Sequence, residues 1–455
     1  MDVLQTISAC ARSYGLQSIS NFAVTLWDSL KFEVLNVQEE QTAEHALGAL
    51  QSIALRLSRD LNSTDTRTAL ADYIRPITKE CNQQLHEPEH KQAKPAGQIL
   101  ATIAKASPVA FYHVIKASFP ILSTVYQAAD TIPKQRALLE ILVLLLDSAI
   151  TVYGTPATPA QETNIENPLK PFKDRVFELT CQALMSTAID EISFRIVALK
   201  ALLRLSLLRS YLDNNEVGMV VQHCNEITLS EDPMGRDSLK KDAIQALIEI
   251  SRIQPDLIMN VTFPAFLAKL PDYASPGHFD YLVTLEALAQ LSVDRFVAET
   301  LIRRLLSRLD VVLSKDGAPA YPRAIISTMY YILTRCQLLS TSNMQVYFEK
   351  IVVDLTQKIV CGSIGKAPKT ALNEEKTMET MARLATLTIK SLDAHKKKSL
   401  ALQCYSLFSE DLAFVSIPFR QHADESQMAT MILSTAIIAG VTPKVCSRIL
   451  IMTVH

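Results

Sequence analysis

The sequence predicts an all-α fold: a solenoid of the HEAT or armadillo type, in which antiparallel helix pairs stack into a superhelix. Three observations predict it. Glycine accounts for only 11 of 455 residues, whereas β-sandwiches, barrels and dinucleotide-binding folds use glycine in turns, bulges and phosphate loops. Apolar residues recur at helical spacing. A short alanine–leucine pattern returns at about 40 to 47 residues, the period of HEAT and armadillo units.

The repeated pattern is small–x–x–Ala–Leu–x–x–Leu/Ile–small. It occurs at residues 46–54, 198–206, 243–251 and 284–292. The second alanines of the last three copies are Ala201, Ala246 and Ala287, which lie about 45 and about 41 positions apart. Alanine is expected where a neighbouring helix crosses closely, and leucine fills the space between layers. Each copy is therefore predicted to be the second helix of a pair.

The other helices follow from the same spacing. First helices of the four pairs are expected at residues 22–34, 172–185, 216–228 and 257–270. Two more pairs are expected from segments 67–85, 97–105, 108–128 and 134–153. Later pairs are expected at 295–312 with 323–334, 345–360 with 375–392, and 397–408 with 426–438. Ser107-Pro108 and Thr442-Pro443 are typical of a helix N-cap followed by proline in the first turn.

The chain is predicted to divide into four parts. Residues 1–153 form N-terminal HEAT-like repeats, 154–171 a proline-rich loop, 172–340 central HEAT repeats, and 341–455 further HEAT-like repeats. The four prolines of the second part predict an exposed insertion. Residues 443–455 begin an amphipathic helix and then the sequence stops, whereas a solenoid normally ends in a polar capping helix. This predicts that the chain is truncated at the C-terminus, a piece of a longer array.

Composition excludes several classes of protein. The 45 basic and 47 acidic residues give a net charge of -2, so no direct contact with nucleic acid is expected. The most apolar stretches are 138–152, which contains Glu140 and Asp147, and 428–441, which is too short to span a bilayer, so no membrane segment is expected. Asp2 stands where a signal peptide would carry basic residues.

The eight cysteines are scattered without a CxxC pair, which is typical of reduced, buried thiols in the cytosol or nucleus. Cys181 and Cys224 are about one repeat apart and could be neighbours in adjacent first helices. Apart from His223, no further ligand follows at a matching spacing. We therefore expect neither an iron–sulfur cluster nor tightly bound zinc.

Three local patterns are candidates for chemical sites. Residues 86–90 (His-Glu-Pro-Glu-His) resemble a metal site, but Pro88 prevents the regular helix of HExxH zinc sites, which favours a solvated loop. His223 and Cys224 are adjacent in a predicted helix, where side chains point about 100° apart, which favours packing. Residues 362–370 fail the spacing of a phosphate loop, so no nucleotide site is expected.

Two basic clusters have simple explanations. Lysines 396–398 open a predicted helix and are typical of a solvated face. Arg303, Arg304 and Arg308 fit the polar side of an amphipathic helix, with Asp310 nearby for pairing. No catalytic, cofactor-binding or metal-ligating residue is therefore predicted, and the protein is not expected to be an enzyme. A helical surface of this kind is used to hold other macromolecules.

Several whole stretches resemble one family. They are residues 26–36 (LWDSLKFEVLN), 171–177 (PFKDRVF), 193–200 (SFRIVALK), 215–221 (NEVGMVV) and 262–266 (TFPAF). They are similar to fungal members of the Mms-nineteen family, the HEAT-repeat DNA repair and transcription protein that is a subunit of the cytosolic iron–sulfur protein assembly targeting complex. The resemblance runs over most of residues 20–340 and contains no catalytic motif.

The resemblance implies an adaptor that helps deliver iron–sulfur clusters to apo-proteins such as DNA helicases, polymerases and repair factors. It implies the cytoplasm and nucleus as location, protein partners, no cofactor and no small-molecule substrate. The alternative is another solenoid scaffold, such as a karyopherin-type nuclear transport receptor. A HEAT-like DNA glycosylase ranks third, because the charge is balanced and the one tryptophan, Trp27, lies in an apolar helix.

Overall fold

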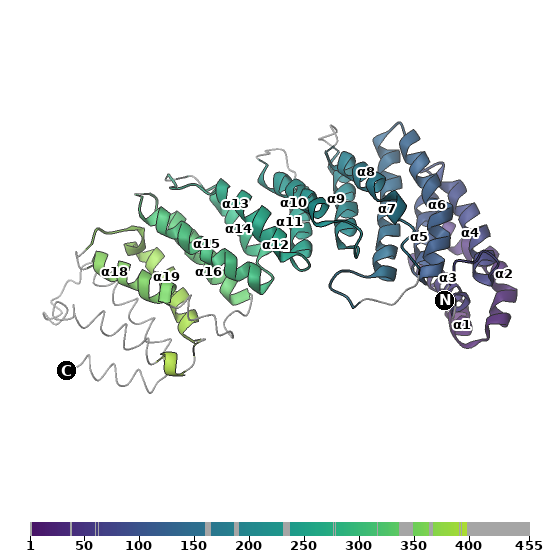
Figure 1. The fold of residues 1–455 in the computed structure, drawn as a ribbon, viewed down its shortest axis with the longest axis horizontal. Coiled ribbons are helices and arrows are strands. Elements are labelled where there is room, and N and C mark those ends of the chain that lie inside the picture. Colours follow the sequence, from purple (N-terminus) through teal and green to yellow (C-terminus); the bar gives the residue numbers. More distant parts are fainter. Residues whose placement is uncertain are drawn as a thin grey trace. The chain divides into compact units, whose positions relative to one another are not determined.

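The computed structural model describes residues 2–36, 39–59, 61, 63–159, 165–185, 191–230, 237–275, 277, 279–315, 317–335, 349–363, 367–390, 392 and 394–397. Every regular element within these ranges is a helix, and the helices stack as pairs (Figure 1), which confirms the predicted all-α solenoid. Packing divides the chain into two compact units, Met1–Ile253 (unit 1) and Gln254–His455 (unit 2). The predicted boundaries at residues 153, 171 and 340 stay predictions.

Unit 1 is built from two rows of helices. In chain order they are α1 (Asp2–Ser13), α2 (Leu16–Leu35), α3 (Glu40–Leu57), α4 (Ala69–Leu85), α5 (Ala93–Ala104), α6 (Pro108–Ala128), α7 (Ile132–Tyr153), the 3-10 helix η1 (Lys170–Phe172), α8 (Lys173–Met185), α9 (Ile192–Leu207), α10 (Asn214–Leu229) and α11 (Asp237–Ser251). Helices α1, α3, α5, α7, α9 and α11 pack successively in one row. Helices α2, α4, α6, α8 and α10 pair with the odd-numbered helix that follows each.

The alanines of the repeat pattern lie at the seams between helices. All of them are buried, with at most a few per cent of their surface exposed: Ala46, Ala49, Ala198, Ala201, Ala243, Ala246 and Ala287. The leucines that follow the second alanine of each copy are buried as well: Leu50, Leu202, Leu247 and Leu288. This confirms the assignment of small residues to close crossings and of leucine to the layers between them.

The predicted cap at Ser107 is confirmed, because its hydroxyl accepts a hydrogen bond from the backbone N–H of Ala110 at 3.1 Å. The predicted helix 108–128 coincides with α6. Helix α1 was not predicted. The predicted pair 397–408 with 426–438 and the predicted cap at Thr442 lie outside the described residues, apart from Lys397.

The proline-rich loop is exposed at residues 156–159, as expected, but anchored at residues 165–169, which corrects the expected exposed insertion there. Ile165 and Leu169 are buried, and the Tyr211 hydroxyl donates to the Leu169 carbonyl at 3.2 Å. The Arg209 guanidinium donates to the Thr155 carbonyl at 2.7 Å. Residues 160–164 lie outside the described part of the chain. The prolines break helices, but the loop is still held to the connection between α9 and α10 through Arg209 and Tyr211.

A close crossing in unit 1 occurs between α5 and α7, at a glycine. A Cβ atom on Gly97 would lie 2.7 Å from Cγ1 and 3.0 Å from Cγ2 of Ile141. Ile141 is itself buried and cannot move aside freely. Gly48 in α3 is the opposite case, because a Cβ there would meet nothing within 4 Å.

Alanine substitutions at these two glycines are predicted to change the stability of the protein in opposite directions. Gly97→Ala should overpack the crossing, which costs about 1 to 3 kcal/mol of folding stability. This cost should outweigh the roughly 1 kcal/mol gained in helix propensity. Gly48→Ala should stabilise by up to about 1 kcal/mol, since it gains propensity without a clash. Chemical denaturation followed by circular dichroism measures both. Equal stabilisation by both changes would contradict the close approach of α5 and α7.

Unit 2 repeats the paired arrangement. Its described helices are α12 (Pro255–Leu257), the π-helix η2 (Ile258–Thr262), α13 (Phe263–Lys269), α14 (Tyr281–Leu291), α15 (Arg295–Leu313), α16 (Ala320–Arg335), the π-helix η4 (Glu349–Asp354), α18 (Leu355–Ser363), the 3-10 helix η5 (Ala371–Asn373) and α19 (Glu375–Lys390). Helices α14, α16 and α19 pack successively in one row, and α15 pairs with α16 (Figure 1).

The predicted continuous helix at 257–270 proved to be three consecutive segments. Pro264 lacks the N–H that would donate to the carbonyl of Asn260 in an α-helix. The backbone N–H of Phe263 donates instead to the Ile258 carbonyl, five residues earlier, which closes a π turn. The predicted helix 345–360 likewise begins with a π-helix within its described part and continues to Ser363.

Candidate functional site

The cysteine and histidine patterns do not converge on a metal site in the described part of the chain. No group of three or more His, Cys, Asp or Glu side chains there is placed to hold a metal ion. Burial raises the pKa of the Cys224 thiol to about 12 and that of Cys181 to about 11, so both stay protonated at neutral pH. His223 Nδ1 lies 3.6 Å from a Glu226 carboxylate oxygen. His86 directly follows the last residue of α4.

The segment compared with a phosphate loop is partly helical. Gly362 lies in the last turn of α18, where a Cβ atom would come 2.6 Å from Asn373 Oδ1. The Thr370 hydroxyl accepts from the Leu372 N–H at 3.3 Å and caps η5. Residues 364–366 lie outside the description. Gly362 and Thr370 thus have packing and capping roles.

Two arginines of α15 contact other parts of unit 2. Arg308 pairs with Asp272 at 2.9 Å, and the Arg304 guanidinium lies 5.7 Å from the centroid of the Phe263 ring. Asp310, expected to pair with these arginines, forms an ion pair with Lys358 at 2.8 Å. Lys396 and Lys397 lie in a helical segment, whereas Lys398 is outside the described residues.

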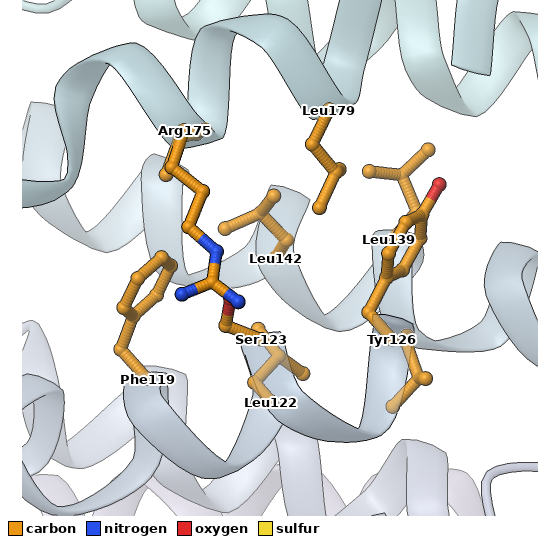
Figure 2. A pocket seen from close by; sticks show the side chains of 10 residues that line it. Phe119, Leu122, Ser123, Tyr126, Leu139, Leu142, Arg175 and Leu179 are labelled. Atoms are coloured by element: carbon orange, nitrogen blue, oxygen red, sulfur yellow. The ribbon is translucent and has the colours of Figure 1, made fainter. Parts of the chain in front are cut away.

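A small pocket lies between α6, α7 and α8 of unit 1. Figure 2 shows the Arg175 side chain reaching from α8 toward Phe119 and Ser123 of α6. The pocket is lined mainly by leucines and measures about 20 Å³, which is room for about one water molecule. The Ser123 hydroxyl is buried and has no hydrogen-bond partner in the described part of the chain. We interpret this pocket as a packing gap between repeats, too small for a ligand.

A much larger groove, of about 610 Å³, runs between α14 and α16 of unit 2. The first turns of the two helices are held together by Tyr281 and Tyr321, whose ring centroids are 4.4 Å apart. Beyond these rings, small residues leave the space between the helices open. They are Ala289 on α14 and Ala320, Ala324 and Ser327 on α16. Burial of the Tyr281 hydroxyl raises its pKa, so it remains protonated.

The rim of this groove is apolar and exposed. Phe279 is 53% exposed, Leu282 45% and Tyr331 47%. Val283, next to Leu282, is 63% exposed. Large apolar side chains gathered at an open groove are typical of a binding surface, and the volume lies within the range of about 300 to 1,000 Å³ usual for ligand sites. We call this site the α14–α16 groove. Its rim is formed by Phe279, Leu282 and Tyr331, its floor by the small residues named above, and it includes Glu286.

The α14–α16 groove carries one carboxylate without a basic partner among the described residues. Glu286, in the middle of α14, accepts a hydrogen bond from Gln290 Nε2 at 3.3 Å and has no other partner among the described residues. Arg323 on the opposite wall pairs with Glu374 at 3.4 Å. The Arg335 guanidinium lies over the Tyr331 ring, 5.9 Å from its centroid. The groove is therefore apolar with a single acidic point, and it lacks an acid–base pair or nucleophile for catalysis.

This groove was not predicted from the sequence. The available signal was the stretch 279–283 (Phe-Asp-Tyr-Leu-Val), where four of five residues are large and apolar. A helix that packs on one side can bury only part of such a stretch, so some of these side chains had to remain exposed.

Comparison with known proteins finds similarity to one family. The sequence model of the family described as "RNAPII transcription regulator C-terminal" (MMS19_C) matches residues 284–454. The chain is 24% identical over 359 residues to the "DNA repair/transcription protein mms19" of Schizosaccharomyces pombe, which covers 78% of this chain and 35% of that protein. It is 25% identical over 362 residues to the "MMS19 nucleotide excision repair protein homolog" of Xenopus laevis, covering 77% and 34%.

A third relative is a DNA repair/transcription protein of Saccharomyces cerevisiae. It is 21% identical over 361 residues, which cover 72% of this chain and 34% of that protein. The chain thus spans about a third of the length of these relatives.

Among solved structures, importin beta matches with a TM-score of 0.43 and 12% identity, over 96% of this chain and 52% of that one. The karyopherin Kap121p matches with a TM-score of 0.30 and 11% identity, over 99% and 55%. None of the described helices is both long and apolar enough to cross a membrane. The similarity along more than three quarters of the sequence, together with the match to the family's C-terminal region, supports the resemblance to the Mms-nineteen (MMS19) family.

Proposed function

We propose that this chain is a non-enzymatic adaptor of the cytosolic iron–sulfur protein assembly targeting complex. In this role it helps transfer iron–sulfur clusters to apo-proteins of DNA repair, replication and transcription. The observation that carries the proposal is the similarity to proteins named for DNA repair, nucleotide excision repair and transcription. Its partners are the other subunits of the complex and clients such as DNA helicases and polymerases, met in the cytoplasm and nucleus.

The described geometry supports an adaptor more than an enzyme. The rows of paired helices present long side-chain surfaces, and the opening of about 610 Å³ between α14 and α16 is an apolar groove with a single acidic group. Proteins built from stacked repeats use such surfaces to hold other macromolecules.

Quantitative co-purification tests the proposal. The tagged chain is expressed in cells that lack the endogenous family member, beside a full-length relative as the positive control. We expect targeting-complex subunits and client helicases to be enriched, more weakly than with the full-length protein because the chain spans about a third of it. Enrichment of importin cargo or a Ran-type GTPase instead would favour a transport receptor.

The chain is predicted to carry no metal of its own. Cluster binding typically needs several thiolates that converge on one site, and the two thiols expected to be neighbours, Cys181 and Cys224, have raised pKa values. After anaerobic purification we expect far less than one equivalent of iron, sulfide or zinc per chain. Near-stoichiometric metal that withstands dialysis against a chelator would overturn this prediction.

A further inference from the structure

We propose that the α14–α16 groove binds an amphipathic helix of a partner protein whose apolar face carries one lysine or arginine opposite Glu286. The inference rests on the proposed function only in requiring that the chain works by holding other proteins. It adds the site, the form of the partner segment and the charge that this segment must carry.

The shape of the groove favours a helix as the occupant. Its walls are two neighbouring helices whose first turns are joined by the Tyr281–Tyr321 ring contact. A helix can lie in the furrow between two packed helices when the residues beneath it are small, as Ala289, Ala324 and Ser327 are here. Helix α14 has 11 residues, so the groove is about 16 Å long and matches about three helical turns.

The order of side chains along the groove sets the pattern of the partner. Phe279 and Leu282 lie around the start of α14 and Glu286 in its middle, whereas Tyr331 lies in the second half of α16. A three-turn helix places residues i, i+4 and i+7 along one line. The outer two positions should be large and apolar to cover the exposed rim. The middle position should be basic.

The charge of Glu286 determines which residue the partner helix should carry at its middle position. Among the described residues Glu286 has no basic partner, whereas Arg323, across the groove, is already paired with Glu374. Covering Glu286 with an apolar side chain would remove water from an unpaired carboxylate, which is costly. A lysine or arginine would pair with this carboxylate while its hydrocarbon stem contacts Leu282.

Two synthetic peptides test the proposal on the full chain. Both are labelled 15-residue helices of alanine and leucine with a polar back face, and they differ only in lysine or glutamate at the middle of the apolar face. Fluorescence anisotropy gives the dissociation constants. We expect the lysine peptide to bind at least about fivefold more tightly than the glutamate peptide, and Glu286→Lys to reverse this preference. A reversal cannot result from misfolding, which would weaken binding of both peptides.

Glu178→Lys is the matched control. Glu178 lies on α8 of unit 1 and accepts a hydrogen bond from Gln182 four residues later, the same local arrangement as Glu286 with Gln290. This variant should leave both dissociation constants unchanged. Ser327→Trp, at an exposed position on the groove floor, should weaken binding of both peptides by about tenfold or more with little change in stability.

Three peptide results would overturn the inference: no binding of either peptide, no preference for lysine, or a preference unaffected by Glu286→Lys. Self-association of the chain that Ser327→Trp abolishes would also overturn it, because the occupant would then be a second copy of the chain. Repeating the co-purification with Ser327→Trp separates the two proposals. If Ser327→Trp recovers the targeting subunits as well as the parent chain does, the adaptor proposal stands and the groove is not needed for it. If Glu286→Lys reverses the peptide preference but the targeting subunits are not recovered, the groove proposal stands and the adaptor proposal fails.

Discussion

Trp27→Ala is expected to destabilise unit 1 by about 3 to 5 kcal/mol, the usual cost of removing a fully buried aromatic side chain. The Trp27 side chain has no exposed surface within α2. The Lys31 ammonium lies 5.8 Å from the centroid of its ring and also pairs with Glu80 of α4 at 3.0 Å. Loss of the indole would therefore leave a cavity and also remove one neighbour of the ion pair that joins α2 to α4.

Denaturation in guanidinium chloride, followed by circular dichroism, measures this effect. Intrinsic fluorescence is unsuitable, because the chain has a single tryptophan. Phe22→Ala on the same helix is the control, since Phe22 is 64% exposed and its removal should change stability by no more than about 0.5 kcal/mol. Equal midpoints for the two variants would show that α2 is not packed as described.

Trp27→Phe adds a second comparison. The indole Nε1 is buried without a hydrogen-bond partner, and such a donor contributes a cost to the folded state. Phenylalanine removes this donor and keeps most of the apolar volume, so we expect a cost below about 1.5 kcal/mol. The difference between the alanine and phenylalanine variants thus measures the filled volume separately from the polar group.

The fold was predictable where the relevant forces are local. The helix at 108–128 has a serine cap, a proline in the first turn and a regular apolar stripe, and these features are all visible in the sequence. The buried alanines were predictable for a related reason. A close crossing tolerates only a small side chain, so the repeat period itself marks the seams.

The errors fall where distant contacts override local preference. Prolines in 154–171 predicted an exposed loop, but Leu169 is buried and its carbonyl accepts from Tyr211, which is 42 positions away. In helix 257–270 a break at Pro264 was readable, whereas its form, a π turn at the preceding residues, depends on how α12 and α13 pack against their neighbours.

The candidate site was not predictable for a similar reason. The α14–α16 groove requires Ala289 on one helix to face Ala324 on another, 35 positions later, with no large side chain between them. Nothing in the local pattern distinguishes these alanines from those that fill seams. That Glu286 lacks a basic partner among the described residues, while Arg323 has one, also depends on the arrangement of α14, α16 and the start of α19.

Ala201→Leu and Ala246→Leu are each expected to destabilise unit 1 by about 1 to 3 kcal/mol through overpacking. Ala201 on α9 and Ala246 on α11 are buried, and the two helices pack against each other. Leucine is a good helix former, so any loss of stability arises between helices rather than within them. Three extra carbon atoms at a seam must displace a neighbouring helix or adopt a strained rotamer.

Ala9→Leu in α1 is the matched control, because Ala9 is exposed and the same three carbons meet solvent there. Its stability should stay within about 0.5 kcal/mol of the parent. The double variant Ala201→Leu/Ala246→Leu tests whether the two positions share a seam. A shared seam should give a cost that differs from the sum of the single costs by about 0.5 kcal/mol or more, because one displacement of α9 from α11 relieves both clashes. Additive costs would place the two alanines at separate crossings, and single variants as stable as Ala9→Leu would contradict the close packing of these helices.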